Sequence, residues 1–248
     1  MTTIKKTLFF LFGLFVYFIA LITLAYMAGF LGNFLVPNSI DGLPRTDTWS
    51  AILTNILLIL VFTCQHSIMA RQGFKKWWIR IIPKPIERST FVLFSSLALL
   101  FIFHYWQPIR GIVWDFQSAP LAVIFYAIYF LGWTIVVVAT FLINHWDLFG
   151  LRQVYLYLVD RPYTALDLSK PFFYGRIRHP LYLGFLITFW ATPTMTVTHL
   201  LFSVLVSTYI FLAVKLEEKD LISDFKDQYL EYKKKVPMLL PINKKAKN

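Results

Sequence analysis

Charge and cysteine are both scarce in this chain of 248 residues. Only 15% of the residues are charged and 58% are hydrophobic, whereas a soluble globular protein is about a quarter charged and about half apolar. The single cysteine, Cys64, excludes an intramolecular disulfide and a cysteine-based metal cluster, and we expect it to be an inert thiol in the core. The scarcity of charge excludes an ordinary soluble domain and indicates a membrane protein.

Six apolar stretches are candidate membrane spans, for which a helix needs about 20 residues, and the fifth of them is short. They cover residues 8–31, 51–70, 90–106, 119–143, 180–192 and 199–216. Only "PTMTVT" separates the last two, which we interpret as a tight helical hairpin, with a re-entrant hairpin as the alternative. The sequence therefore predicts an all-α polytopic membrane bundle of about six spans, followed by an amphipathic helix over 217–236.

Lysine and arginine are distributed unevenly along this topology. Six spans would place 22 of the 24 on one side, which the positive-inside rule assigns to the cytoplasm together with both termini. The basic start "MTTIKK" also fits a signal peptide, but the following apolar stretch is too long for one. We expect a protein of the bacterial inner membrane. Its net charge of +11 reflects topology and contact with anionic lipid, and no basic stripe indicates nucleic-acid binding.

Polar side chains gather at the span ends that this topology places on the cytoplasmic side. Ionisable groups at membrane depth are costly and usually face a bundle interior or a watery cavity. Four span ends that supply such groups at one level therefore predict a shared site. The residues are Gln65, His66, Arg71, Asn144, His145, Asp147, Arg152, Gln153, Arg178, His179, Tyr182, Glu217 and Glu218.

The fifth span begins with an unusual sequence, "RIRHPLYLG". Pro180 suits the first helical turn, so His179 is expected near the N-cap with Tyr182 on the same face. The positive end of this helix, with Arg176 and Arg178, could hold an anionic group such as a carboxylate. Alternatively, the two arginines only anchor the helix at the lipid headgroups.

Two further segments are candidates for closing the site. Residues 144–178 form a long connection, which we interpret as a cytoplasmic lid. The helix expected over 217–236 has an apolar face and would lie on the membrane surface. Alternatively, it closes the site, because Glu217 and Glu218 stand where the sixth span leads into it.

Several of these motifs resemble those of a known enzyme superfamily. The pattern R-H-P-x-Y-x-G at 178–184, the pair Glu217 and Glu218, and the tyrosines Tyr229 and Tyr232 resemble the isoprenylcysteine carboxyl methyltransferase superfamily of integral-membrane proteins. Upstream, Q-H-S-x-M-A-R at 65–71, E-R-S-T at 87–90 and N-H-x-D-L-F-G-L-R-Q at 144–153 are more narrowly similar to the methanethiol S-methyltransferases and their nurim-like relatives.

This resemblance implies an S-adenosylmethionine site open to the cytosol, with a small apolar thiol as the methyl acceptor. The implied cofactor-binding residues are Arg178, His179, Tyr182, Glu217, Glu218, Tyr229 and Tyr232. Candidates for binding the substrate are Gln65, Arg152 and Gln153. Five scattered histidines without cysteines at ligand spacing do not indicate a metal site.

A thiol must lose its proton before it attacks a methyl group, so a nearby base would help. The candidate catalytic residues are His145, oriented by Asp147, and His66 beside Gln65. Each histidine could instead be a hydrogen-bonded core group.

Three functions remain open at this point. The first is methylation of a small thiol, with methanethiol converted to dimethyl sulfide. The second is methylation of another apolar acceptor, such as a prenylcysteine carboxylate or a lipid amine. The third is a non-catalytic membrane protein of the nurim type. Fold alone does not decide between them.

Overall fold

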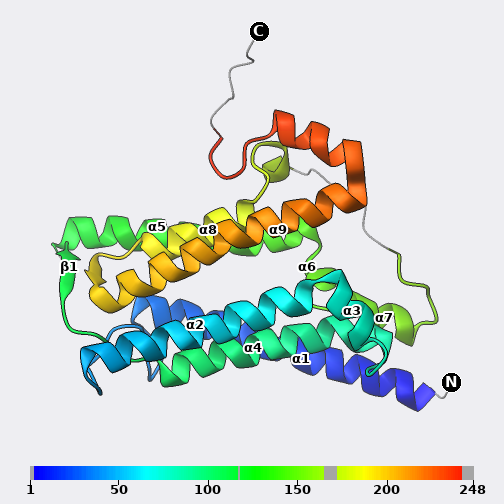
Figure 1. Cartoon of the computed structure of the whole chain (residues 1–248), viewed down its shortest axis with the longest axis horizontal. Helices are drawn as coiled ribbons and strands as arrows, with labels where there is room; N and C mark the ends of the chain where they lie inside the picture. The colour runs from blue at the N-terminus through cyan, green and yellow to red at the C-terminus, as the bar shows by residue number, and fades with distance from the viewer. Residues whose placement is uncertain (1–2, 117, 165–171, 242–248) are drawn as a thin grey trace, which may run out of the picture. The chain divides into compact units, whose positions relative to one another are not determined.

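The computed structural model describes residues 3–116, 118–164 and 172–241 (Figure 1). The chain divides into two compact units, and each is built from separate stretches of sequence. Unit 1 contains Met1–Val113, Asn144–Ala165 and Met195–Phe202. Unit 2 contains Trp114–Ile143, Leu166–Thr194 and Ser203–Asn248.

Helices make up nearly all of the regular structure in the described residues (Figure 1). Unit 1 holds α1 (Thr3–Gly32), α2 (Thr48–Ala70), α3 (Gln72–Trp78), η1 (Lys84–Ile86), α4 (Glu87–Tyr105), α6 (His145–Leu148) and α7 (Leu151–Leu158). Unit 2 holds α5 (Ala119–Ile143), η2 (Phe172–Gly175), α8 (Pro180–Trp190) and most of α9 (Val197–Lys235). The strands β1 (Ile112–Asp115) and β2 (Thr194–Thr196) pair in a two-stranded sheet.

Within the described residues, five helices are long and apolar enough to cross a membrane. They are α1, α2, α4 together with η1, α5 and α9, whereas the apolar helix α8 has only 11 residues. This confirms an all-α membrane protein. Six crossings stay a prediction, because α8 is shorter than a span of about 20 residues.

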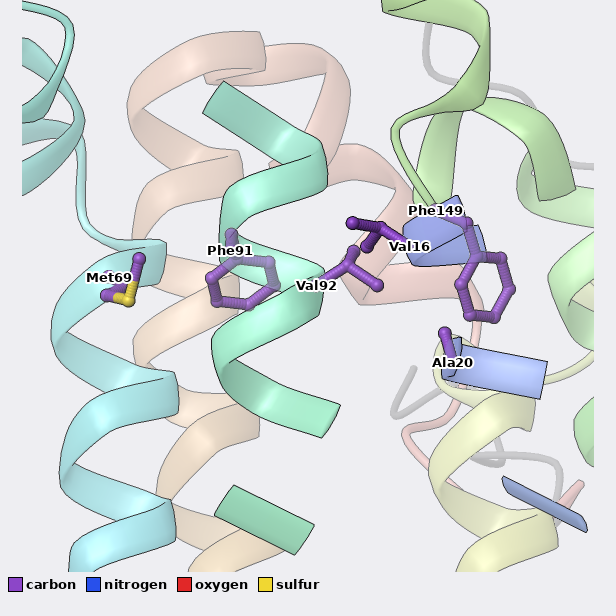
Figure 2. Close-up of a cluster of buried hydrophobic side chains, with 6 residues drawn as sticks. All are labelled: Val16, Ala20, Met69, Phe91, Val92 and Phe149. Atoms are coloured by element: carbon purple, nitrogen blue, oxygen red, sulfur yellow. The ribbon is translucent and has the colours of Figure 1, made fainter. Parts of the chain in front are cut away.

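The core of unit 1 lies where α1, α2 and α4 meet the turn after α6. Its buried side chains are Val16, Ala20, Met69, Phe91, Val92 and Phe149 (Figure 2). In this cluster α4 contributes two adjacent residues, while Phe149 comes from a segment more than 50 positions further along the chain. The cluster therefore fixes the short helix α6, and with it His145, against the longer helices.

A glycine brings α4 close to the turn between α6 and α7. Gly150 has a φ of 85°, and a Cβ at this position would lie 2.7 Å from the backbone nitrogen of Ser89. Nearby, the Arg88 Nε donates a hydrogen bond to the carbonyl oxygen of Leu148 at 2.8 Å. Any other residue at position 150 would be strained and would push α4 away.

The core of unit 2 depends on a close approach of α5 and α8. A Cβ on Gly132 would lie 2.9 Å from the carbonyl oxygen of Gly184, and a Cβ on Gly184 would lie 2.8 Å from that of Gly132. Small residues at facing positions let membrane helices pack backbone to backbone. On α9, the Ser203 hydroxyl donates to the carbonyl oxygen of Phe189 at 2.6 Å, which joins the end of α8 to α9.

Helix α9 differs from the expected division into a span at 199–216 and a separate helix at 217–236. It continues through Glu217 and bends at Lys226, where φ is 46° and ψ is −125° (Figure 1). The acidic and basic residues after position 216 favour helix, and no Gly or Pro interrupts them. Beyond the bend, Tyr229, Tyr232 and Val236 pack against apolar residues at 221, 222 and 225.

Two other expectations change in the structure. Residues 144–178 contain the helices α6, α7 and η2, although 165–171 of this expected lid lie outside the described residues. Cys64 was expected in the core, but it is exposed on α2. An apolar side chain on a membrane helix is as stable facing lipid as facing the protein interior. The apolar character of Cys64 therefore did not indicate that it is buried in the core.

Candidate functional site

The predicted motif at the start of α8 forms a buried network centred on Glu218 of α9. The Arg178 Nε donates to Glu218 Oε1 at 2.7 Å, and the His179 Nε2 lies 3.2 Å from the same oxygen. The Lys233 Nζ donates to Glu218 Oε2 at 2.6 Å. The side chains of Arg178 and Glu218 are 6% and 7% exposed, so this is a buried ion pair with a second cation at its edge.

Arg178 also holds the chain that follows α9. Its Nη1 donates to the carbonyl oxygen of Val236. Two backbone hydrogen bonds run alongside, from Arg178 N to Pro237 O at 2.9 Å and from His179 N to Met238 O at 3.1 Å. The backbone donors that precede α8 are therefore satisfied by this returning segment rather than left open for a ligand.

Glu217 presents the more accessible carboxylate of the acidic pair. Its Oε2 accepts a hydrogen bond from the Tyr182 hydroxyl at 2.8 Å and lies 3.9 Å from the His179 Nδ1. The rings of His179 and Tyr182 are 5.6 Å apart, as their expected common face requires. The Glu217 side chain is 44% exposed and that of Glu218 only 7%, so Glu217 is the more accessible of the two to a ligand.

The two tyrosines beyond the bend of α9 pack beside this network. The Tyr232 hydroxyl donates to the carbonyl oxygen of Tyr174 at 2.5 Å. Tyr229 is 1% exposed, and its buried hydroxyl has no hydrogen-bond partner among the described residues. Burial raises the pKa of Tyr174, which lies outside the spans. Tyr174 therefore stays protonated near neutral pH, and Tyr229 offers an unused polar atom.

A pocket of about 260 Å³ adjoins Glu218. It is lined by Lys215, Glu218, Lys219, Ile222 and Lys233. Both signs of charge therefore line a concave surface within unit 2.

In unit 1, His145 is paired with a residue that the sequence did not indicate. Its Nε2 lies 2.9 Å from the hydroxyl oxygen of Tyr17 on α1. The rings of Tyr17, Trp146 and Phe149 surround the imidazole, which is 7% exposed. Burial lowers the pKa of His145, so the imidazole is neutral at pH 7.

The carboxylate of Asp147, which was expected to orient His145, makes its hydrogen bonds with other residues. It accepts hydrogen bonds from the Arg152 Nη1 at 2.9 Å and from the Tyr163 hydroxyl at 3.3 Å. Among the described residues it makes no hydrogen bond to His145. Arg152 reaches on to Thr164, with 2.8 Å between its Nη2 and the Thr164 hydroxyl. Asp147 and Arg152 therefore brace the segment after α6.

The remaining candidates of unit 1 lie in two places. Gln153 is close to Asp147, because its Nε2 donates to the Asp147 carbonyl oxygen at 3.2 Å. On α2, the His66 Nδ1 lies 3.1 Å from the Ser95 hydroxyl, while the Gln65 Nε2 contacts the Met69 sulfur at 3.1 Å. His66 and Gln65 thus have separate partners, and His66 resembles a hydrogen-bonded core group.

Most of the expected site residues therefore form two clusters, each described within its own unit, whereas Gln65 and His66 on α2 belong to neither. The cofactor candidates lie together in unit 2, and the candidate base lies in unit 1 with Asp147, Arg152 and Gln153. Sequence reasoning missed Tyr17, Lys233 and Tyr163. A tyrosine in an apolar span looks like any interfacial aromatic, and only Lys233 lies close to a motif that was recognised. No cluster of metal-ligating residues occurs in the described ranges.

Comparisons with known proteins identify several relatives of this chain. No family model matches the chain, and no solved structure matches it. A methanethiol S-methyltransferase of Crocosphaera subtropica is 49% identical over 98% of this chain and 96% of its own length. One of Mycobacterium tuberculosis is 43% identical over 96% of this chain and 97% of its own length. Nurim of Sus scrofa is 30% identical over 66% of this chain and 65% of its own length.

The helical membrane fold and the full-length relatives define the class of protein, which is an integral-membrane methyltransferase. Within that class the resemblance seen in the sequence is confirmed. The chain belongs to the family of methanethiol S-methyltransferases.

Proposed function

We propose that this protein transfers the methyl group of S-adenosylmethionine to methanethiol and so produces dimethyl sulfide. The observation that carries this proposal is the likeness, over nearly the full chain, to several relatives that bear the name methanethiol S-methyltransferase. The network at the start of α8 supports it, because it joins the motif residues of the resemblance through hydrogen bonds.

The residues of unit 2 fit the proposed cofactor. S-adenosylmethionine carries a carboxylate, an ammonium group, ribose hydroxyls and a cationic sulfonium. Glu217 has an accessible carboxylate, and Tyr229 has a buried hydroxyl without a partner among the described residues. We assign ligand binding to His179, Tyr182 and Glu217, and assign to Arg178 and Glu218 the task of holding α8 and the C-terminal segment in place.

Bound S-adenosylmethionine supplies an electrophilic methyl group on sulfur. The thiol must therefore reach it as a thiolate. The free thiol of a cysteine has a pKa of about 8.5, so most of it is still protonated at pH 7 and a base is needed. His145 is suited to accept this proton because burial keeps its imidazole neutral. The resulting thiolate would then accept the methyl group, which bound S-adenosylmethionine would give up as its sulfonium becomes a neutral thioether.

The proposed setting is the bacterial inner membrane with both termini and the site in the cytoplasm. The 22 lysines and arginines that six spans place on one side support this orientation. A reporter fused after residue 248 should be active in the cytoplasm. Activity of that fusion outside the cytoplasm would refute the proposed topology.

The proposed reaction can be tested with the purified full chain, labelled S-adenosylmethionine and a panel of thiols, carboxylates and amines. Label should appear in dimethyl sulfide when methanethiol is the acceptor. Calorimetry on Glu217→Gln should show weaker cofactor binding, while Glu231→Gln, an exposed carboxylate of the same helix, should bind as the wild type does.

Other results would refute the proposal in different ways. Transfer only to a carboxylate or an amine would replace methanethiol with another acceptor. Cofactor binding without transfer to any acceptor would favour a non-catalytic nurim-like protein.

A further inference from the structure

The pocket that adjoins Glu218 lies wholly within unit 2, between the two arms of α9 on either side of its bend. The lining residues before the bend are Lys215, Glu218, Lys219 and Ile222. Their spacing of i, i+3, i+4 and i+7 places them on one face of the helix. Lys233 lines the pocket from beyond the bend, where α9 has changed direction (Figure 1). The bend therefore brings a third lysine to a face that already carries two.

This pocket has an excess of positive charge. Among the described residues Glu218 is the one acidic side chain that lines it, and its two oxygens accept from Arg178 and Lys233. Lys215 and Lys219 are exposed, and neither makes a hydrogen bond or an ion pair with the described residues. Lys233 has three N–H donors, of which Glu218 accepts one. Donors from three lysines are thus available to an anion.

The size of the pocket restricts what this anion is. Pockets that enclose a drug-sized molecule measure about 300–1,000 Å³, whereas this one measures about 260 Å³. It is therefore suited to one compact group of a larger molecule. A phosphate matches the lining, because its oxygens accept charge-assisted hydrogen bonds from several ammonium groups at once.

The position of the pocket on α9 indicates the source of the phosphate. The helix is long and apolar enough to cross a membrane, and Lys215 stands at the end of its apolar stretch. One turn earlier, the side chains of Phe211 and Leu212 are exposed. A phospholipid presents its phosphate at the membrane surface and its acyl chains beneath. This part of α9 offers cations and apolar surface in the same order.

We propose that the pocket binds the phosphate of an anionic phospholipid, whose acyl chains lie against the apolar surface of α9. Lys215 and Lys219 contact the phosphate from the arm before the bend, and Lys233 contacts it from the arm beyond. Basic pockets at the ends of membrane helices bind anionic headgroups in this way. The bound lipid joins the two arms of α9. The inference goes beyond the proposed methyl transfer and does not rest on it.

The affinity for lipid tests this inference without any enzymatic reaction. The purified full chain in a neutral detergent is titrated with short-chain phosphatidylglycerol, and thermophoresis gives the dissociation constant. Lys219→Gln should weaken binding about fivefold, and its combination with Lys215→Gln about 25-fold, because each lysine attracts the headgroup separately. Lys235→Gln removes the same charge from an exposed position of α9 outside the pocket and should bind as the wild type does. Equal affinity in the wild type and the double variant would overturn the inference.

A conservative variant separates lost charge from lost folding. Lys219→Arg keeps the cation and should bind phosphatidylglycerol nearly as well as the wild type does. If it binds as weakly as Lys219→Gln, the charge of Lys219 does not hold the lipid and the inference fails.

Three other ligands identify the source of the phosphate. Phosphatidylcholine of the same chain length has no net charge, glycerophosphoglycerol is the same headgroup without chains, and inorganic phosphate is the anion alone. Each should bind at least about tenfold more weakly than phosphatidylglycerol, because it lacks either the net charge or the apolar contact. Equal binding of phosphatidylcholine would refute selection by charge. Equal binding of either soluble anion would replace the lipid with a free anion.

The cofactor provides the last comparison. The pocket is too small to enclose S-adenosylmethionine, so a saturating amount of this cofactor should not displace phosphatidylglycerol. Displacement would assign the three lysines to the cofactor site and would overturn a separate lipid site.

Discussion

Glu218→Gln is expected to loosen the C-terminal segment of unit 2 much more than its change of one atom suggests. The carboxylate of Glu218 accepts from Arg178 at 2.7 Å and from Lys233 at 2.6 Å, and Arg178 is 6% exposed. An amide leaves this buried guanidinium without a counter-charge and turns a donor toward one of the two cations. Sequence neighbours cannot compensate, because the partners come from three separate segments.

The magnitude follows from the burial of each partner. Removing one member of a buried ion pair costs about 3–5 kcal/mol. The side chain of Lys233 is 41% exposed and water can solvate it, so we expect the lower end of the range. About 3 kcal/mol corresponds to a local opening equilibrium that is about 100-fold more favourable.

Hydrogen exchange measures this opening directly. The amide protons of Arg178 and His179 are bonded to carbonyl oxygens of the returning segment at 2.9 and 3.1 Å, so their protection should fall by that factor. The matched control is Glu231→Gln, whose pair with Lys234 is exposed on both sides and should not affect protection. Unchanged exchange at positions 178 and 179 in Glu218→Gln would refute the role of Glu218 as the centre of this network.

Three further predictions follow from single contacts. Tyr182→Phe removes the hydroxyl that holds Glu217 at 2.8 Å, and calorimetry should show cofactor binding about tenfold weaker. Gly150→Ala places a side chain on a residue with a φ of 85° and should lower the free energy of unfolding by more than about 1 kcal/mol. Gly73→Ala is the control, because a Cβ there meets open space, and it should not lower the free energy of unfolding. Burial lowers the pKa of His145 from its ordinary value of about 6.5, so the midpoint of the acid limb of the pH–rate profile should lie below that value; a midpoint above it would exclude His145 as the base.

Local features of the site could be predicted from the sequence because each depends on a few adjacent residues. Pro180 occupies the first turn of α8 with His179 at the cap, as the order of these two residues indicates. Tyr182 lies near His179 because three helical positions bring side chains to one face. By contrast, we expected Asp147 to orient His145 only because the two residues are close in the sequence. In the structure the Asp147 carboxylate accepts hydrogen bonds from Arg152 and Tyr163 instead.

The sequence by itself determined the class of environment, since a chain with so few charges and such long apolar stretches has to satisfy its backbone within helices in a membrane. It also identified the motif residues, because their side chains are of the types that the proposed methyl transfer needs. Only the tertiary structure decided how they are paired. Tyr17 meets His145 across 128 positions, and Arg178 meets Glu218 across 40, because side-chain partners depend on how helices pack and on which side chains of each face meet. Apolar helices present similar faces in many directions, so hydrophobicity alone does not specify that packing.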